Sequence, residues 1–182
     1  AGAADIGENR IQEAKKKYET LGRDVTWHLI GHLQTNKAKQ AVKYFDLIHS
    51  VDSFHLAKEL DKEAGKLGKV QDVLVQVNLA KEDSKSGVYE EDLFNMLDEV
   101  DKLAHLHLVG LMCIAPNYEN VEEFRPLFHR MYEIFQKAKE IPYQTATIRY
   151  LSMGMTHDYA IAVEEGANIV RVGTAIFGPR QY

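Results

Sequence analysis

The last buried segment of the chain reads Ile169-Val-Arg-Val-Gly-Thr-Ala-Ile-Phe-Gly178. It is an apolar strand with one charged interruption, Arg171, and it ends in Gly173 and Thr174. A short strand that ends in glycine and a hydroxyl residue can point several backbone N–H groups and a hydroxyl at one anion. The stretch therefore predicts a buried strand with a phosphate-binding turn at its carboxyl end.

The same order of residue types occurs one segment earlier, in Tyr150-Leu-Ser-Met-Gly-Met-Thr156. Ser152 and Gly154 follow the apolar residues, and we expect Thr156 to cap the helix that comes next. Two adjacent strands would then deliver hydrogen-bond donors to one phosphate group. On composition alone, the alternative is that these residues serve only as turn and cap residues.

Composition predicts one domain over residues 1–182, because 45% hydrophobic residues suffice for one core and no composition shift marks a second. The net charge of −5, with lysines scattered among glutamates, argues against a nucleic-acid partner. The single cysteine, Cys113, leaves no internal disulfide, and no long apolar run or signal-like start is present. We therefore expect a cytoplasmic protein without membrane association.

Strand and helix patterns alternate along the chain. One-sided apolar spacing predicts helices, and continuous aliphatic runs predict strands that are covered on both faces. The alternation indicates a parallel sheet with right-handed crossovers. The helices are expected near residues 11–21, 57–67, 93–103, 124–138 and 160–163, and the strands at 4–7, 27–31, 47–51, 73–78, 108–113, 150–154 and 169–173.

Roughly seven βα units can be counted, one fewer than the eight of a closed (β/α)8 TIM barrel. An opened barrel leaves two apolar strand edges unpaired, so we expect the first strand and helix to be missing from this sequence, which starts at Ala1 without methionine. An open doubly wound sheet is the alternative. It is disfavoured because no Gly-x-Gly-x-x-Gly turn opens the chain.

In such a barrel the functional residues follow the carboxyl ends of the strands, and the last two loops commonly hold phosphate. The two predicted phosphate turns occupy these loops. The residues at the strand ends, which are the candidates for a site, are Glu8, Asn9, His32, Asp52, Asn78, Met112, Ser152, Thr156 and Thr174.

Arg171 is the charged residue for which we predict a functional role. Strand alternation places Val170 and Val172 on one side, so that Arg171 and Gly173 face the mouth of the barrel. A guanidinium is seldom buried without an acceptor. The alternative is a structural ion pair with a carboxylate elsewhere in the fold.

Two other patterns are weaker. His28 and His32 have the i, i+4 spacing of a helical zinc pair, but residues 27–31 are a predicted strand, where this spacing does not make a helical pair. No Cys or Glu cluster completes a site, so we expect no metal. Cys113 follows a strand end with nothing beside it in the sequence that would activate a thiol, which favours a structural role over nucleophilic chemistry.

Six segments, taken in order, form a specific series. They are Gly7-Glu-Asn-Arg-Ile-Gln-Glu13, Trp27-His-Leu-Ile-Gly-His-Leu-Gln-Thr-Asn-Lys37, Ser84-Lys-Ser-Gly87, Gly110-Leu-Met112, Leu151-Ser-Met-Gly-Met-Thr156 and Val170-Arg-Val-Gly-Thr-Ala-Ile-Phe-Gly178. The series closely resembles the pyridoxal-phosphate homeostasis protein family, small relatives of the barrel domain of alanine racemase. The resemblance implies a single-domain barrel that carries pyridoxal 5′-phosphate (PLP), buffers or delivers it inside cells, and has no established catalytic turnover.

The resemblance also implies a role for individual residues. Arg171 would face the pyridine nitrogen of PLP, and Asn9 would line the pocket near the ring. A permanently charged donor at the ring nitrogen cannot stabilise a protonated pyridinium, so it weakens the ring as an electron sink. The residues implied to hold the phosphate are Ser152, Met155, Thr156, Gly173 and Thr174.

The Schiff-base lysine of the family would lie upstream of this chain, at the end of the first strand. Lys37 and Lys85 lie in family-like segments but are not placed to replace it. We expect these 182 residues alone to bind PLP weakly and without a covalent bond, and a longer protein with that lysine to bind it covalently.

Two other functions stay open. A PLP-dependent amino-acid racemase would need a second base from another domain or subunit. A barrel enzyme that acts on a phosphorylated metabolite would use the same phosphate turn for its substrate. The expected partners are PLP and PLP-dependent client enzymes, and the expected state is a monomer or a weak dimer.

Overall fold

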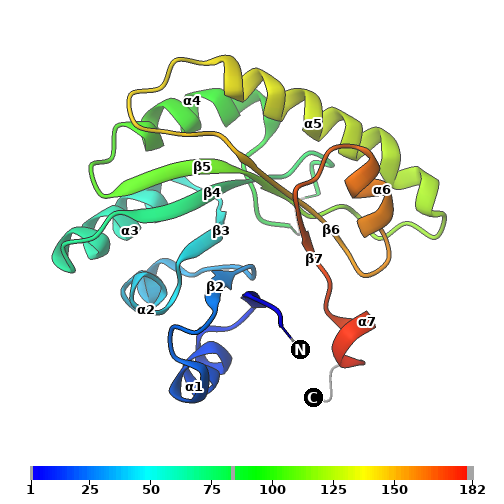
Figure 1. The fold of residues 1–182 in the computed structure, drawn as a ribbon. Coiled ribbons are helices and arrows are strands. Elements are labelled where there is room, and N and C mark those ends of the chain that lie inside the picture. Colours follow the sequence, from blue (N-terminus) through cyan, green and yellow to red (C-terminus); the bar gives the residue numbers. More distant parts are fainter. Residues whose placement is uncertain (1, 83–84, 180–182) are drawn as a thin grey trace.

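The computed structural model describes residues 2–82 and 85–179. Seven parallel strands form one sheet in which each strand pairs with the next one of the sequence, and the sheet curls into a nearly closed barrel with helices on its outer side (Figure 1). The strands are β1 (Asp5–Glu8), β2 (Thr26–Leu29), β3 (Leu47–Val51), β4 (Gln71–Val77), β5 (Leu106–Cys113), β6 (Tyr150–Met155) and β7 (Ile169–Arg171).

The barrel prediction is confirmed. The strand order contains no reversal, which excludes the doubly wound sheet. Ser84, in the third of the six motifs, lies outside the described residues. The helices are α1 (Ile11–Leu21), α2 (Ala38–Tyr44), α3 (Phe54–Lys66), α4 (Glu90–Asp101), α5 (Phe124–Glu140), α6 (Tyr159–Glu164) and α7 (Thr174–Phe177), with 3-10 helices η1 (Thr35–Lys37) and η2 (Val121–Glu123).

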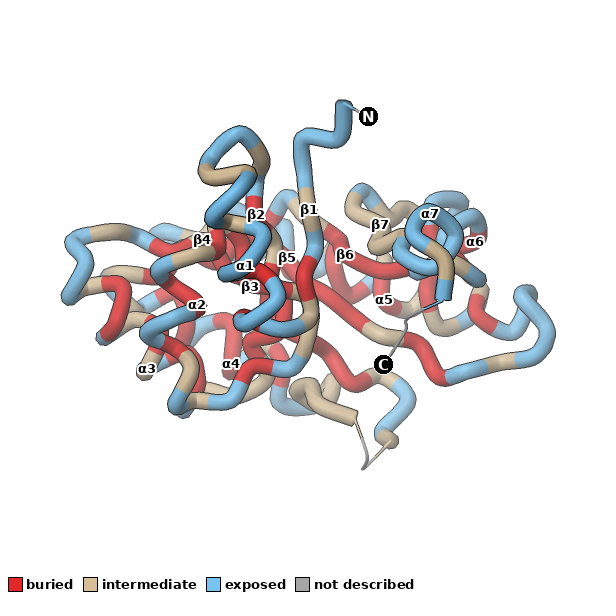
Figure 2. Tube along the Cα trace, turned by 90° about the horizontal axis from the view of Figure 1, so that it is seen from below, coloured by how far each residue is buried: buried red, intermediate tan, exposed pale blue. Residues whose placement is uncertain are grey.

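Two hydrophobic clusters lie on the two faces of the sheet. The large one fills the space between the strands and the helices, and the buried residues follow the strands and the inward sides of the helices (Figure 2). The small one joins residues of non-adjacent strands, such as Leu47 of β3 and Val109 of β5, and Tyr150 and Ile169 pack against it. It therefore lies inside the barrel, where side chains of several strands meet.

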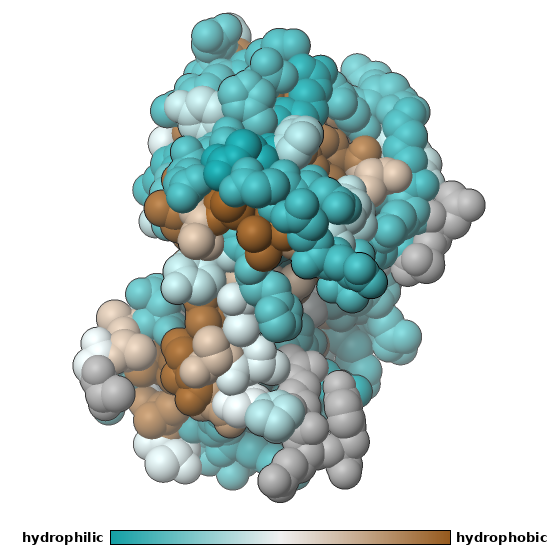
Figure 3. Space-filling view, turned by 90° about the vertical axis from the view of Figure 1, so that its right-hand side faces the viewer, coloured by the Kyte–Doolittle hydropathy of each residue, from teal (hydrophilic) through white to brown (hydrophobic). Residues whose placement is uncertain are grey.

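The barrel is open between β1 and β7, which are the two ends of the strand order. Helix α7 follows β7 and exposes its apolar side chains: Ile176 is 67% and Phe177 84% accessible. Figure 3 views the side of the molecule on which α6 and α7 lie, where exposed hydrophobic residues also include Val163 of α6. No helix in the described parts of the chain is both long and apolar enough to cross a bilayer.

Candidate functional site

The carboxyl ends of β6 and β7 meet, because the two strands pair in parallel through Ser152 with Ile169 and Met155 with Arg171. The backbone N–H of Gly173 donates to the Thr156 hydroxyl oxygen at 3.3 Å, and the N–H of Ala175 approaches the same oxygen at 3.4 Å. The structure thus brings the two predicted phosphate turns together.

The space around this meeting point suits an anion. A Cβ atom built on Gly173 would find no atom within 4 Å, so the backbone there faces open space. Gly173, Thr174 and Ala175 are exposed. The N–H of Thr174, at the start of α7, has no hydrogen-bond acceptor among the described residues. The amides of Gly173 and Ala175 make only long hydrogen bonds to Thr156, and the Thr174 amide makes none to described residues. These N–H groups can therefore donate to an oxyanion.

Gly154 determines how closely α6 approaches β6. Its φ is +94°, and a Cβ there would lie 2.6 Å from the Cβ of Ala162 and 3.0 Å from the Cα of Tyr159. A side chain would therefore push α6 away from the strand. The predicted helix cap at Thr156 is wrong: α6 begins at Tyr159, because the chain makes a full turn after β6 before the helix starts.

Asp158 stabilises this turn. Its carboxylate accepts a hydrogen bond from the N–H of Met155, and the side chain is 4% exposed. The amide of Met155, which belongs to the predicted phosphate site, is therefore already hydrogen-bonded within the turn.

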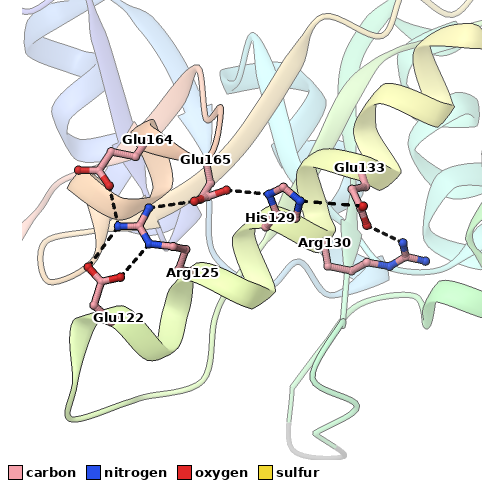
Figure 4. A network of polar contacts seen from close by, with 7 residues as sticks. All are labelled: Glu122, Arg125, His129, Arg130, Glu133, Glu164 and Glu165. Carbon is pink, nitrogen blue, oxygen red and sulfur yellow. Dashed lines mark hydrogen bonds and ion pairs between the residues drawn. The ribbon is translucent and has the colours of Figure 1, made fainter.

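Helix α6 is also held from outside, by an ion-pair network with α5 (Figure 4). The Arg125 guanidinium lies 2.7 Å from a Glu164 oxygen and 2.9 Å from a Glu165 oxygen, and it also pairs with Glu122. His129 adds a contact of 2.9 Å to Glu165. Single surface ion pairs contribute little, but one guanidinium shared by three carboxylates restricts the end of α6.

Arg171 points into the barrel, as the alternation of β7 predicts. Its guanidinium donates to the Ser152 hydroxyl oxygen at 2.7 Å and to the carbonyl oxygen of Cys113 at 2.9 Å. Neither acceptor is a carboxylate, and no ion pair of Arg171 is seen within the described residues, so the structural ion-pair alternative lacks support. Burial lowers the pKa of Arg171, but guanidinium groups stay charged in proteins.

Ser152 is completely buried, and its hydroxyl lies between Arg171 and a second residue, His49. The Nδ1 atom of His49 is 2.9 Å from the Ser152 oxygen. The structure thus places this predicted phosphate ligand beside the guanidinium, in the barrel interior, and four positions before Thr156 on the chain.

Sequence reasoning missed His49, which lies in the centre of β3 and is fully buried. Its Nε2 atom is 2.9 Å from Nδ1 of His28, and Nε2 of His28 is 3.0 Å from a carboxylate oxygen of Asp5. One signal was available: His49 shares the inner face of β3 with Leu47, two positions earlier, so alternation points an ionisable ring into the barrel.

Two of the other strand-end candidates, Asn9 and His32, have contacts in the loops after the first four strands. Asn9 follows β1, whose edge is not paired with β7, and its carbonyl oxygen would lie 2.3 Å from a Cβ on Gly31. His32 contacts Ser86 at 2.9 Å and Asp52 at 3.3 Å, which joins the loops after β2, β3 and β4.

Structural contacts are also seen for the strand-end candidate Asn78, and for Lys85 and Cys113, which were not expected to act in the site. The Asn78 amide donates to the carbonyl oxygens of Glu82 and Lys85. Lys85 donates to the carbonyl oxygen of Ala115. Burial raises the pKa of Cys113 to about 12, which agrees with an inert thiol.

Comparison with known proteins gives consistent matches along the chain. The family model described as "Alanine racemase, N-terminal domain" matches residues 1–181. A protein of Aquifex aeolicus (strain VF5) with the name pyridoxal phosphate homeostasis protein is 46% identical over 182 residues, which are 100% of this chain and 79% of that protein. A protein of the same name from Haemophilus influenzae is 38% identical over 186 residues, covering 100% of this chain and 78% of the relative.

Among solved structures, PipY of Synechococcus elongatus PCC7942 is 41% identical to this chain. The form without PLP superimposes with a TM-score of 0.91 over 97% of this chain and 83% of PipY. The form with PLP bound superimposes with a TM-score of 0.89 over 97% of this chain and 82% of PipY.

Proposed function

The chain belongs to the pyridoxal phosphate homeostasis protein family, built on the N-terminal domain of alanine racemase, and we propose that it binds PLP and buffers or delivers it without turning over a substrate. The observation that carries the proposal is the meeting of an anion site and a guanidinium on two adjacent strands. Thr156, Gly173 and Thr174 supply the anion site, and Arg171 supplies the guanidinium.

The residues present fit a phosphorylated pyridine. A phosphate dianion needs hydrogen-bond donors, and the turn offers the Thr156 hydroxyl and the backbone N–H groups of Gly173 and Thr174. The pyridine nitrogen is an acceptor, and Arg171 uses only two of its five N–H groups on described residues. When bound, PLP supplies an aldehyde and an electron-withdrawing ring.

The contacts refine the site that the sequence predicts. We assign the phosphate to Thr156, Gly173 and Thr174, because the Met155 amide is bonded to Asp158. We assign Ser152 to Arg171 rather than to the phosphate, because its hydroxyl is enclosed in the barrel interior. Asn9 stays the proposed ring-side residue at the end of β1.

A non-catalytic role is supported by Arg171. A permanently charged donor opposite the ring nitrogen disfavours a protonated pyridinium, and with it carbanion chemistry. A racemase also needs a second base close to the ring. The buried Cys113, whose pKa is raised by burial to about 12, does not supply one.

We also propose that one further βα unit would pair with the edges of β1 and β7, which have no strand partner among the described residues, and would cover the exposed apolar side chains of α7. By the resemblance to the family, the PLP-binding lysine would lie on that strand. We also propose a cytoplasmic protein whose partners are PLP and the enzymes that receive it.

Equilibrium dialysis of the 182-residue chain against PLP, pyridoxal and ribose 5-phosphate tests the function. We expect PLP to bind most tightly, because it alone offers both the phosphate and the pyridine ring, and we expect Arg171→Leu to remove the preference for PLP over ribose 5-phosphate. Tighter binding of ribose 5-phosphate would favour a sugar-phosphate enzyme. Racemisation of alanine at the common enzymatic rate of roughly 1 s⁻¹ or more would overturn the non-catalytic role.

A further inference from the structure

A chain of hydrogen bonds crosses the barrel interior from β1 to β7. It runs from Asp5 to His28 at 3.0 Å, from His28 to His49 at 2.9 Å, from His49 to Ser152 at 2.9 Å, and from Ser152 to Arg171 at 2.7 Å. One end is exposed, since the Asp5 side chain is 65% accessible, and the other end is the guanidinium of the proposed PLP site.

When both histidines are neutral, the two ends of this chain determine the direction of every hydrogen bond in it. Arg171 can only donate, so the Ser152 oxygen accepts from it and the Ser152 hydroxyl proton is free to donate to Nδ1 of His49. An ionised Asp5 can only accept, so His28 donates to it from Nε2 and accepts at Nδ1. The remaining hydrogen bond joins the two histidines, and its donor is then the N–H at Nε2 of His49.

His49 is neutral in this arrangement. Burial, followed by the electrostatic repulsion that a protonated His49 would meet from His28 and Arg171, holds the pKa of His49 well below its usual range. The ionisable and charged groups around it are His28 on β2 and Arg171 on β7, while Asp158 and Cys113 lie near Arg171. A neutral imidazole with one proton at Nε2 can accept a hydrogen bond from Ser152 at Nδ1 and donate one to His28 from Nε2 at the same time.

The linked polar side chains form a layer of the barrel interior beside an apolar layer. Leu47, Tyr150 and Ile169 belong to the inner hydrophobic cluster, and His49, Ser152 and Arg171 follow each of them by two positions on the same strands. Burying polar side chains costs free energy unless all of them are paired. These hydrogen bonds extend as far as Arg171, whose guanidinium is the group that would donate to the cofactor.

We propose that His49 is a positioning residue for PLP: in its Nε2–H form it accepts a hydrogen bond from the Ser152 hydroxyl at Nδ1, which orients the Ser152 oxygen to accept from Arg171 and so holds the guanidinium toward the pyridine ring. This role rests on the proposed function. Without an acceptor at Nδ1, the Ser152 hydroxyl rotates freely, and Arg171 loses one of its two fixed contacts. His49 itself does not touch the cofactor.

Two variants of His49 separate this role from simple packing. In His49→Asn the amide oxygen takes the place of Nδ1 and still accepts from Ser152, whereas His49→Leu retains bulk but has no acceptor. We expect His49→Leu to weaken PLP binding by about tenfold, the effect of one lost hydrogen bond to a charged group, and His49→Asn to restore most of it. Affinity for inorganic phosphate alone should be equal in all three proteins, because the phosphate turn is untouched.

Equal PLP affinity in His49→Leu and the wild type would overturn the role. So would a parallel loss of PLP and inorganic phosphate affinity, since that is the result of a general structural defect. If His49→Leu does not fold, Ser152→Ala provides the second variant, because it cuts the same link and leaves His49 neutral.

A second measurement does not depend on PLP. Long-range proton–nitrogen correlation spectra of the cofactor-free chain at neutral pH report the tautomer of each histidine, and we expect the Nε2–H form for both His49 and His28. An Nδ1–H or doubly protonated His49 would contradict the proposed direction of the chain. If the tautomers are as expected and wild-type protein binds no PLP, the proposed function fails while the hydrogen-bond chain stands.

Discussion

The Nδ1 atom of His49 lies 2.9 Å from the hydroxyl oxygen of Ser152, although 103 positions separate the two residues in the sequence. They belong to β3 and β6, which are not neighbours in the sheet. The contact therefore crosses the interior, and only a curled sheet brings the two side chains together. Because Ser152 also accepts a hydrogen bond from Arg171, the orientation of Arg171 depends on the same curling of the sheet.

The pH dependence of stability should depend on His49. Burial, followed by the electrostatic repulsion that a protonated His49 would meet from His28 and Arg171, keeps its pKa well below 6.5 in the folded protein. The unfolded chain takes up a proton there near pH 6.5 that the folded protein does not bind, so this contribution to stability is present above about pH 6.5 and is lost as the pH falls. We expect the free energy of unfolding of wild type to decrease below that pH by up to about 1.4 kcal/mol per pH unit more steeply than that of His49→Asn.

Urea unfolding curves over this pH range measure the difference, and the histidines that do not contact His49 cancel because both proteins contain them in the same surroundings. Parallel pH profiles would show that His49 is protonated in the folded protein and would contradict its burial as a neutral ring.

Thr156 should matter for anion binding and little for folding. Its hydroxyl accepts only long hydrogen bonds from Gly173 and Ala175 and lies at the open end of the barrel. A hydrogen bond to a charged group contributes about 1.5–3 kcal/mol, so Thr156→Ala should weaken inorganic phosphate binding by about tenfold or more. Titration calorimetry measures this, and Thr156→Ser should restore most of the affinity. Unchanged phosphate affinity in Thr156→Ala would place the anion elsewhere.

Gly154 and Gly173 should respond differently to the same substitution. Gly154→Ala puts a methyl group 2.6 Å from the Cβ of Ala162 at a φ of +94°, so we expect a loss of about 1–3 kcal/mol in unfolding free energy. Gly173 has a φ of −119° and open space around it, so Gly173→Ala should leave thermal stability nearly unchanged.

The methyl group of Gly173→Ala should instead occupy the space in front of the phosphate turn and weaken phosphate binding. If the Gly173→Ala variant instead had a lower thermal stability and the phosphate affinity of the wild type, the result would argue against an anion site at the turn.

Asp101 should be a stability residue remote from the site. Its carboxylate, 5% exposed, accepts from the backbone N–H groups of Gln144, Thr145 and Ala146 at 2.6, 2.9 and 2.7 Å. Burial raises its pKa, but these hydrogen bonds outweigh burial and leave the pKa below its usual value. Asp101→Asn places amide protons against backbone donors. We therefore expect the free energy of unfolding, measured by chemical denaturation, to fall by about 2–3 kcal/mol.

The matched control is Asp98→Asn on the same helix. The Asp98 side chain is 66% exposed and pairs only with Lys102 among the described residues, so its substitution should change stability little. PLP affinity should be the same in both variants, because Asp101 fastens the loop that enters β6 at the amino end of the strand.

Local patterns were sufficient for most elements. The strand at residues 47–51 and the helix at residues 11–21 have the predicted bounds, and the other predicted elements differ by one to three residues at an end. Helices α2 and α7 were not predicted, because their seven and four residues are too short for a clear apolar period. The cap at Thr156 was wrong because the turn geometry depends on the close approach of α6 at Gly154, which no spacing reveals.

The sequence by itself determined the alternation of strands and helices and the neighbourhood of Thr156 and Gly173. Both follow from local rules, since apolar periodicity defines each element and consecutive parallel strands of a barrel lie side by side. The tertiary structure alone decided that Ser152 faces Arg171 and that His49 supports them. The contact between His49 and Ser152 joins two strands that are distant along the chain and in the sheet, so it depends on how far the sheet curls. The contact between Ser152 and Arg171 joins neighbouring strands and depends on which side chains fill the barrel interior.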